Sequence, residues 1–452
     1  MRQMTLVAFL QAQNCTNFVG SWRHPEASPD FMTADYYRHI ARVLEAGKFH
    51  VGFFDDRLAM PDRYGGDHAH TVANGIRCVK MDPMTILTVM GMATERLGLA
   101  ATYSTTYYEP FHVARLYATL DLMTNGRAAW NIVTSMNDGE ALNMGHASHS
   151  EHDERYDRAD EFLEVVAGHW DSWDDDALVI DRQSGLFAHP DKVRRLDHQG
   201  AFFRSRGPFT VPRSAQGHPV LIQAGQSGRG RKFAARWAEL VFVNYHSLAQ
   251  AKADYAAFKQ QVAETGRDPE KVFVAAGVYT VVAETRAEAE DKAALIDSLP
   301  KEIDQLSLLC EVLNVDLAKK PLDEPWSEEE ITAWTGAQGL RDRVYRILGK
   351  RNPTTRDFME VSRRGTFHDH PRFIGSPKDV ADGMEEWFAG RACDGYVVAA
   401  SHVPGGYEEF VRYVVPELQR RGLFHNDYRG TTLRENLGLD RPHIGAWREV
   451  RN

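Results

Sequence analysis

The chain has 452 residues, of which 43% are apolar and 26% charged, a composition typical of globular proteins and not of disordered or fibrous ones. The net charge of −10 argues against sequence-independent binding to nucleic acids. No apolar run reaches the length of a membrane-spanning helix, and the four scattered cysteines form no CxxC pair, which favours a cytoplasmic protein without membrane partners.

Apolar runs of strand length alternate with helical patterns along most of the chain. The first run lacks a small-residue cleavage site and is followed at once by polar residues, so we interpret it as a strand and not as a signal peptide. The expected strands cover residues 4–12, 51–56, 97–104, 127–135, 218–225, 240–244, 272–282 and 394–401. The expected helices cover residues 34–49, 82–98, 110–126, 153–173, 227–238, 248–265, 284–297, 377–390 and 406–421.

Eight strand candidates that alternate with helices predict an α/β protein with a parallel sheet. Units of this number and size favour a closed (β/α)8 TIM barrel, with an open doubly wound sheet as the alternative. Two long insertions interrupt the pattern, at about 136–217 and 298–372, and we expect residues 1–452 to form one barrel domain that carries them. The second insertion, charged at 323–330, is expected to be a mobile lid over the strand ends.

Functional residues of such a barrel lie where its strands end. The candidates there are Asp55, Asp56, Ser104, Thr105, Thr106, Asn131, Thr134, Ser135, Gly225, Gln226 and Ser227. In the stretch 223–235, QAGQSGRGRKFAA, a glycine-rich turn joins a strand to a helix, which favours an anion site unless the turn is an ordinary one. Ser227, Arg229 and Arg231 are placed to contact a phosphate there.

Other motifs narrow the chemistry. The segment 151–166 is helical in pattern and places His152 and Tyr156 on one face, either to grip a polar ligand or to cap and pack. The chain has no GxGxxG after a strand and no GK[ST], so neither a nicotinamide site nor a nucleoside-triphosphate loop is expected. It has no GxSxG nucleophile elbow, which argues against a hydrolase. Its histidine pairs lack the spacing of metal ligands, so we expect no metal.

Several stretches, in order along nearly the whole chain, resemble the flavin-dependent monooxygenases of the bacterial-luciferase superfamily. The similar branch includes nitrilotriacetate, pristinamycin, long-chain alkane and dibenzothiophene-sulfone monooxygenases. The stretches are NCTNFVGSWRHP, GKFHVGFFDD, ATYSTTYYEPFHVAR, LDLMTNGRAAWNIVTS, EHDERYDRADEFLE, HPVLIQAGQSGRGRKFAA, IGSPKDVAD, DGYVVAAS and PGGYEEFVRYVVPELQRRG.

The resemblance implies a luciferase-like barrel that oxygenates a substrate through a flavin (hydro)peroxide. Its cofactor would be FMN, delivered as FMNH2 by a separate NAD(P)H:flavin reductase, with O2 as oxidant and a homo-oligomer, a dimer or tetramer, as the assembly. The implied cofactor-binding residues are Asp56, Thr105, Thr106, Asn131, Thr134, His152, Tyr156, Gly225, Ser227 and Gly228.

The catalytic group and the substrate are less defined by the resemblance. Many relatives place histidines shortly before WRHP, but in this chain residues 16–19 read TNFV and include no histidine. No catalytic residue is therefore assigned, and His24 and Asn17 remain as candidates. Residues 22–64 and 406–438 look most like the dibenzothiophene-sulfone branch, which implies a small hydrophobic aromatic substrate, such as an aromatic sulfone, a sulfur heterocycle or a halogenated aromatic. The expected pocket residues are Phe9, Phe18, Phe54, Tyr107, Phe242 and Tyr245.

Three alternatives remain open at this point. A polyaminocarboxylate such as nitrilotriacetate or EDTA would require several Arg or Lys in the cavity. A deazaflavin-dependent hydride-transfer enzyme would share the barrel but would not depend on oxygen. A non-catalytic flavin-binding protein would hold oxidised FMN without turnover.

Overall fold

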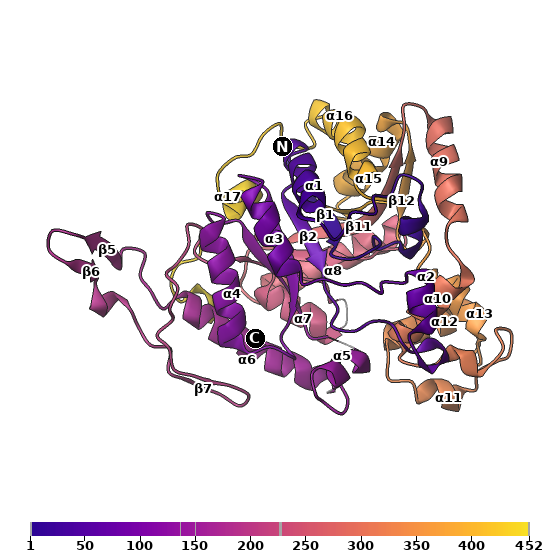
Figure 1. Cartoon of the computed structure of the whole chain (residues 1–452), viewed down its shortest axis with the longest axis horizontal. Helices are drawn as coiled ribbons and strands as arrows, with labels where there is room; N and C mark the ends of the chain where they lie inside the picture. The colour runs from indigo at the N-terminus through magenta and orange to yellow at the C-terminus, as the bar shows by residue number, and fades with distance from the viewer. Residues whose placement is uncertain (1, 136, 150, 226–227, 451–452) are drawn as a thin grey trace.

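The computed structural model describes residues 2–135, 137–149, 151–225 and 228–450, and its centre is a closed parallel barrel (Figure 1). Eight strands pair in the order β1-β2-β3-β4-β9-β10-β11-β13, and β13 pairs with β1 to close the ring. The closed barrel is therefore confirmed over the open sheet. The strands are β1 (Thr5–Gln11), β2 (Val51–Asp55), β3 (Gly98–Ser104), β4 (Ala128–Val133), β9 (Val220–Gln223), β10 (Leu240–Val243), β11 (Phe273–Val282) and β13 (Gly395–Ala399).

Helices pack around the barrel where the periodicity predicts them. Asp82 caps its helix by accepting from the N–H of Met84, and Asn125 and Gly126 take the left-handed conformation that ends the next one. The barrel helices are α1 (Ala34–Ala46), α3 (Pro83–Met92), α4 (Pro110–Met123), α6 (His152–Trp170), α7 (Gly228–Trp237), α8 (Leu248–Glu264), α9 (Arg286–Ser298) and α14 (Pro377–Ala389). The last helical region runs through α15 (Gly405–Glu409), η6 (Phe410–Val414) and α16 (Val415–Arg420).

The strands separate two apolar regions, because successive side chains of a strand point to opposite faces. Leu6, Ala8 and Leu10 of β1 pack outward against the helices, whereas Val7 and Phe9 belong to the barrel interior. The short helix α17 (Leu433–Leu437) closes the amino-terminal end of the barrel with Leu433 and Leu437. Polar ligands therefore reach the interior only from the carboxyl ends of the strands.

The first insertion contributes α5 (Asp138–Asn143) before the barrel helix α6 and two hairpins after it. The hairpins are β5 (Leu178–Asp181) with β6 (Leu186–Ala188), and β7 (His198–Gln199) with β8 (Arg204–Ser205). The β5–β6 hairpin extends away from the body of the molecule (Figure 1). It exposes Ile180 to 57% and Phe187 to 63%, which is unusual for apolar side chains of a hairpin in water.

The second insertion folds into a helical cap, which we define as residues 298–371. Its helices α10 (Glu302–Leu313), α11 (Glu328–Thr332), α12 (Gln338–Leu348) and α13 (Thr355–Ser362) enclose a core that includes Leu313, Trp334 and Phe358. The segment is thus a folded unit and not a simple loop. A short strand that the sequence analysis missed, β12 (Arg372–Gly375), follows the cap and pairs with the second half of β11.

The cap is attached to the loops at the carboxyl end of the barrel. Arg23, after β1, makes a bidentate ion pair with Asp304 of the cap at 2.6 and 3.0 Å. Glu311 of the cap accepts from the backbone N–H groups of Asp62 and Arg63, which follow β2, at 3.1 and 3.3 Å. The cap therefore covers part of the end of the barrel at which the predicted functional residues lie.

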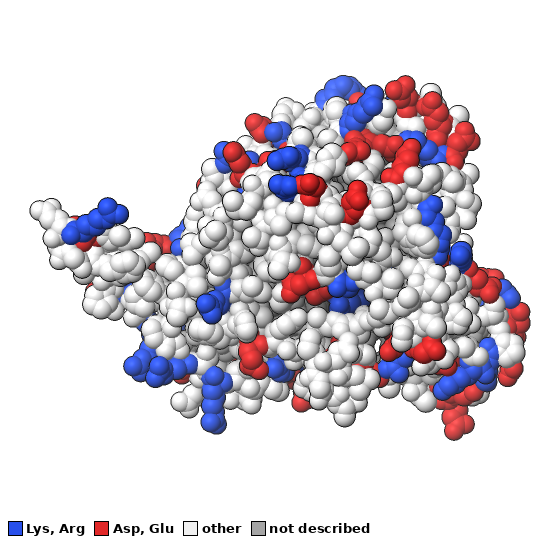
Figure 2. Space-filling view, in the orientation of Figure 1, with Lys and Arg blue, Asp and Glu red and all other residues white. Residues whose placement is uncertain are grey.

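Charged side chains of both signs lie together on one face of the molecule (Figure 2). On the face shown in Figure 2, basic and acidic side chains are interspersed and no continuous basic surface is visible. Among the described residues, no helix is both long and apolar enough to cross a membrane.

The attachment of the cap can be tested through its buried ion pair. Asp304→Asn leaves the guanidinium of Arg23 without its anion, and the Asp304 side chain is only 1% exposed. We expect the free energy of unfolding to fall by about 3 kcal/mol in urea denaturation. The control Asp35→Asn breaks an exposed pair with Arg38 and should cost less than about 1 kcal/mol. An equal loss of unfolding free energy in the two variants would contradict a stabilising role of the Arg23–Asp304 pair.

Candidate active site

Two amide side chains face the interior at the carboxyl end of the barrel without their full set of partners. Asn131 of β4 donates from Nδ2 to the Thr102 hydroxyl at 2.8 Å, but its Oδ1 is buried and has no hydrogen-bond partner among the described residues. Both amide atoms of Gln11, at the end of β1, are in the same situation. Buried polar atoms without partners cost free energy, so this region is suited to a ligand with its own donors and acceptors.

Aromatic rings line the interior next to these amides. Phe9 stacks on Phe53 with centroids 5.4 Å apart, and Phe53 contacts Phe242 at 4.7 Å. All three rings belong to the interior core and not to the layer between strands and helices. Together the rings and the amides form a site for a planar ligand with one polar edge.

On the cap side, a polar cluster connects three chain segments. Asn17 donates from Nδ2 to the hydroxyl of Tyr279 at 3.2 Å and accepts from Nη2 of Arg77 at 2.8 Å. Burial raises the pKa of Tyr279 well above its ordinary value, so this phenol stays protonated. Asn17, one of the two catalytic candidates, is thus fully engaged as a link between Arg77 and Tyr279, neither of which the sequence analysis had named.

Two side chains closely approach Gly277 on this side of the mouth, by which we mean the open carboxyl end of the barrel. A Cβ atom on Gly277 of β11 would lie 2.7 Å from Oδ1 of Asn244 and 2.8 Å from Cδ2 of His370. Only glycine allows these two side chains to come so near to the strand. His370 belongs to the end of the cap, so the cap supplies part of the site wall.

The two acids after β2 have different environments. Asp55 faces inward and contacts Nζ of Lys80 at 2.5 Å. Burial opposes its ionisation, but Lys80, Arg77 and Arg57 together outweigh burial and hold the pKa of Asp55 below its ordinary value. For Asp56, burial outweighs the effect of Lys80 and raises the pKa to about 7. Alternation along β2 therefore makes Asp55 the inward acid beside the predicted Asp56.

A second region lies between α6 and the turn after β9. A Cβ atom on Gly225 would stand 2.8 Å from the hydroxyl of Tyr156, so this hydroxyl closely approaches the glycine turn. The rings of His152 and Tyr156 are 5.1 Å apart, and Gly228 opens α7 with free space around it. The structure thus brings together two motifs that lie about 70 residues apart in sequence. The predicted Ser227 and Gln226 lie outside the described residues.

The predicted threonines join the loops between these two regions. Thr106 donates from Oγ1 to the carbonyl of Thr134 at 2.7 Å, and Thr105 donates from its N–H to the carbonyl of Val133 at 2.9 Å. These bonds fasten the turn after β3 to the turn after β4. Thr105 and Thr134 are nearly buried, so their visible role is to set the shape of the rim.

The arginines predicted to contact a phosphate have other partners. Arg229 pairs with Asp157 and Asp160 of α6 at 2.9 and 2.5 Å. Arg231 contacts the side chain of Gln261 at 3.2 Å. Both arginines thus have protein partners from α6 and α8, and their contact with a phosphate stays a prediction.

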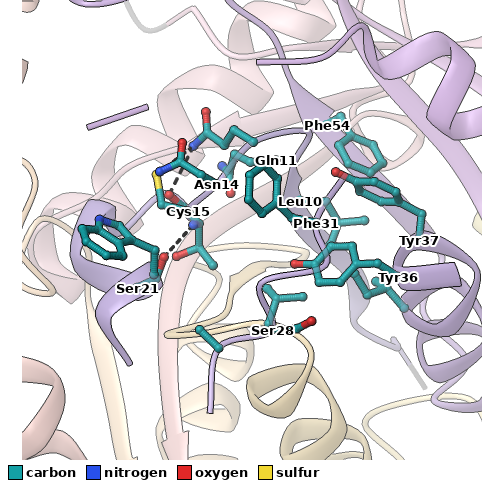
Figure 3. A pocket seen from close by; sticks show the side chains of 16 residues that line it. Leu10, Gln11, Asn14, Cys15, Ser21, Ser28, Phe31, Tyr36, Tyr37 and Phe54 are labelled. Atoms are coloured by element: carbon teal, nitrogen blue, oxygen red, sulfur yellow. Dashed lines mark hydrogen bonds between the residues drawn. The ribbon is translucent and has the colours of Figure 1, made fainter. Parts of the chain in front are cut away.

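Two of the expected pocket residues point the wrong way. Phe54 and Tyr245 belong to the outer core, between the strands and the helices, because each follows an inward residue, Phe53 or Asn244, by one position. Figure 3 shows Phe54 beside Tyr37 of α1, around a cavity of only about 30 Å³. Phe9 and Phe242 do line the interior, while Phe18 is buried against Tyr279 and Phe367. Tyr107 lies outside the mouth, hydrogen-bonded to His149.

His24 lies in a group of metal-ligand type, but with unsuitable geometry. His24, Glu26 and His402 bring one ligand atom each within 4.8 Å of the others. The two imidazole rings stack at 3.8 Å with an angle of 6°, so their nitrogen lone pairs lie in parallel planes and do not converge on one ion. Burial lowers the pKa of His24, which leaves it neutral at pH 7.

Comparisons with known proteins identify the family of the chain. A family model described as luciferase-like monooxygenase matches residues 13–395. The chain is 42% identical over 455 residues to the dibenzothiophene-sulfone monooxygenase of Rhodococcus erythropolis, with 98% of each chain covered. It is 39% identical to nitrilotriacetate monooxygenase component A of Aminobacter aminovorans, with 94% of each covered.

A solved structure supports the flavin assignment. Riboflavin lyase, determined with modified FMN and its substrate riboflavin, superposes with a TM-score of 0.89 at 30% identity, with 97% of each chain covered. The similarity in sequence and fold thus extends over nearly the full length of these proteins. The chain belongs to the luciferase-like monooxygenase family and is a flavin-dependent monooxygenase.

Proposed function

We propose that this chain is the oxygenating component of a two-component system that uses FMNH2 and O2. The observation that carries the proposal is the pair of inward amides, Gln11 and Asn131, whose buried polar atoms have no hydrogen-bond partner among the described residues. An isoalloxazine ring has donors and acceptors along one edge and apolar faces, which matches these amides and the rings of Phe9, Phe53 and Phe242. Tyr156 and the turn at Gly225 would hold the phosphate.

The protein would position the ring and exclude water, while reduced flavin supplies the oxygen-transfer chemistry. The interior below the ring is sealed by α17, and the cap covers part of the mouth. A dry site matters because water diverts activated oxygen from the substrate. We propose the cap as the lid of this site, within a single barrel domain.

A separate NAD(P)H:flavin reductase is part of the proposal. The chain has no GxGxxG fingerprint after a strand, so it has no evident nicotinamide site. One relative is itself named component A, which is consistent with a divided system. The apolar tip of the β5–β6 hairpin, with Ile180 and Phe187 exposed, supports a homo-oligomer.

For the substrate we propose a small hydrophobic aromatic compound, such as an aromatic sulfone, a sulfur heterocycle or a halogenated aromatic. The aromatic interior and the relative that is named for a sulfone support this class. A polyaminocarboxylate is the second candidate. It is favoured by Arg57, Arg77 and Arg364, whose guanidinium groups interact near the mouth; burial and repulsion by the other two lower the pKa of Arg364 to about 9.

The deciding experiment is an aerobic assay with a flavin reductase, NADH and FMN against aromatic sulfones, halogenated aromatics and chelates. With ¹⁸O₂ we expect one labelled oxygen atom in the product by mass spectrometry. The chain alone, with NADH and FMN, should not oxidise NADH. Oxygen-independent turnover would favour the hydride-transfer alternative, and tight FMN binding without turnover would favour the non-catalytic one. Equal turnover with reduced FAD would contradict the choice of FMN.

The phosphate position can be tested by removing one hydroxyl. Tyr156→Phe should weaken FMN binding by about 1 kcal/mol, roughly fivefold in Kd, since one neutral hydrogen bond is lost. The control Tyr255→Phe removes an equally buried hydroxyl that donates to Asp394 at 2.8 Å, far from the proposed site, and should leave FMN affinity unchanged. Ser227→Ala should resemble Tyr156→Phe. Unchanged affinity in both site variants, by fluorescence titration, would remove them from the phosphate site.

The opposite pKa shifts of Asp55 and Asp56 predict opposite pH dependences of stability. Because the folded-state pKa of Asp56 is raised to about 7, its contribution is fully present below about pH 4 and is lost as the pH rises towards 7. Asp56→Asn should therefore gain stability relative to wild type between pH 4 and 7 in urea denaturation. Asp55→Asn, which removes a carboxyl with a lowered pKa, should show the reverse trend at low pH. Parallel profiles of the two variants would contradict these environments.

A further inference from the structure

A cavity of about 240 Å³ lies beside the mouth of the barrel, outside the ring of strands. Its walls are Thr106 and Tyr107 after β3, His146 of the α5–α6 loop, Arg155 and Arg158 of α6, and Phe202 of the β7–β8 hairpin. Because Arg155 precedes Tyr156 on the same helix, this cavity neighbours the proposed phosphate position, but its lining includes the turn after β3 and not the turn after β9.

Arg155 is the unusual residue of this cavity. It is 8% exposed, and its Nε and Nη1 atoms are buried without a hydrogen-bond partner among the described residues. Within the described ranges of the chain, no carboxylate oxygen lies within 4 Å of its guanidinium nitrogens. Two other buried arginines show the contrast: Arg434 makes a bidentate pair with Glu239, and Arg127 donates to four carbonyl groups. A buried guanidinium without an anion is costly, so this one is suited to bind an anion from solution.

The surroundings of Arg155 supply further donors. The hydroxyl of Tyr107 lies 2.9 Å from Nδ1 of His149, while Nε2 of His149 is buried without a partner. Burial, with the nearby charge of Arg155, lowers the pKa of His149 to about 4, so this imidazole is neutral at pH 7 and presents Nε2–H if Nδ1 accepts from Tyr107. Arg158 donates to the carbonyl of Thr105 and stacks on Phe203 at 4.4 Å.

Carboxylates lie near the cavity, but the structure shows none of them in an ion pair with Arg155 among the described residues. Glu154 lines the cavity from an exposed position on the rim. Glu140 and Glu151 act on Arg155 only at longer range, and Glu140 accepts from the backbone N–H groups of Leu58 and Asn137. The interior of the cavity therefore remains a site of positive charge and hydrogen-bond donors.

We propose that this cavity is an oxyanion subsite in which Arg155 is the central donor. The group that it takes is a phosphate, carboxylate, sulfinate or sulfonate, with planar or tetrahedral oxygens that match a guanidinium fork. Two sources fit this chemistry, the phosphate of the flavin or an anionic group of the substrate or product. The assignment of these sources rests on the proposed function, but anion binding by Arg155 does not.

The test compares Arg155→Met with wild type and with the exposed control Arg115→Met. Methionine keeps the apolar stem and removes every donor. Without added anion, Arg155→Met should be at least as stable as wild type to heat, because an unpaired buried charge is removed. Added sodium sulfate should raise Tm more in wild type and in the control than in Arg155→Met. A purely structural arginine would instead make the variant less stable and leave the response to sulfate unchanged.

Binding titrations then identify the source. If the flavin phosphate occupies the cavity, Arg155→Met should weaken FMN binding about tenfold or more and leave riboflavin binding unchanged. If a substrate anion occupies it, FMN affinity should stay the same and the affinity for benzenesulfonate, followed by calorimetry, should fall to a similar extent. Wild-type affinity for FMN and benzenesulfonate in the variant, together with an unchanged sulfate response, would overturn the proposal. None of these readouts requires turnover, so a failed oxygenation assay leaves them interpretable.

Discussion

The alternation of side chains along eight parallel strands is the constraint on which the site depends. In each strand one set of side chains packs against the helices and the other set points into the closed interior. Near α17 the interior side chains are apolar. The inward polar residues Gln11, Asp55 and Asn131 lie in the carboxyl-terminal halves of their strands. The barrel therefore concentrates its unsatisfied polar groups at one end, next to a stack of aromatic rings.

The elements added to the barrel complete that end in different ways. The cap contributes His370 to the wall and attaches through Arg23 and Asp304 to the loop after β1. The helix α6 serves two regions at once, since Tyr156 approaches Gly225 while its neighbour Arg155 faces the cavity beside β3. The mouth forms because the loops after the strands are long enough to contact one another over the strand ends.

Much of the fold follows from sequence patterns because those patterns are local. Most strand and helix positions agree with the structure to within a few residues, although the helix expected at 82–98 ends at Met92. Asp82 and Asn125-Gly126 are local sequence signals that mark helix ends. The choice of Phe54 and Tyr245 was wrong by a single position each. For Tyr245, period-two counting from Phe242 in the same segment would have indicated Asn244 as the inward neighbour.

Other parts of the site have no such local signal. Asn17 contacts Arg77, which lies 60 positions away, and Tyr279, which lies 262 positions away. The partners of Arg229 come from another helix. The core of the cap and the strand β12 likewise depend on tertiary contacts that periodicity does not encode. The meeting of Tyr156 with the glycine turn was anticipated through the family resemblance and not through any spacing in the chain.

The most direct measurement of the central claim is a crystal structure of the protein soaked with FMN. The account predicts that the isoalloxazine ring lies inside the mouth, with its polar edge hydrogen-bonded to the amides of Gln11 and Asn131 and one face towards Phe9, Phe53 or Phe242. The phosphate should lie within reach of Tyr156, on the side of Gly225 or in the cavity at Arg155. A flavin bound elsewhere, with the Gln11 and Asn131 amides still unpaired, would contradict it.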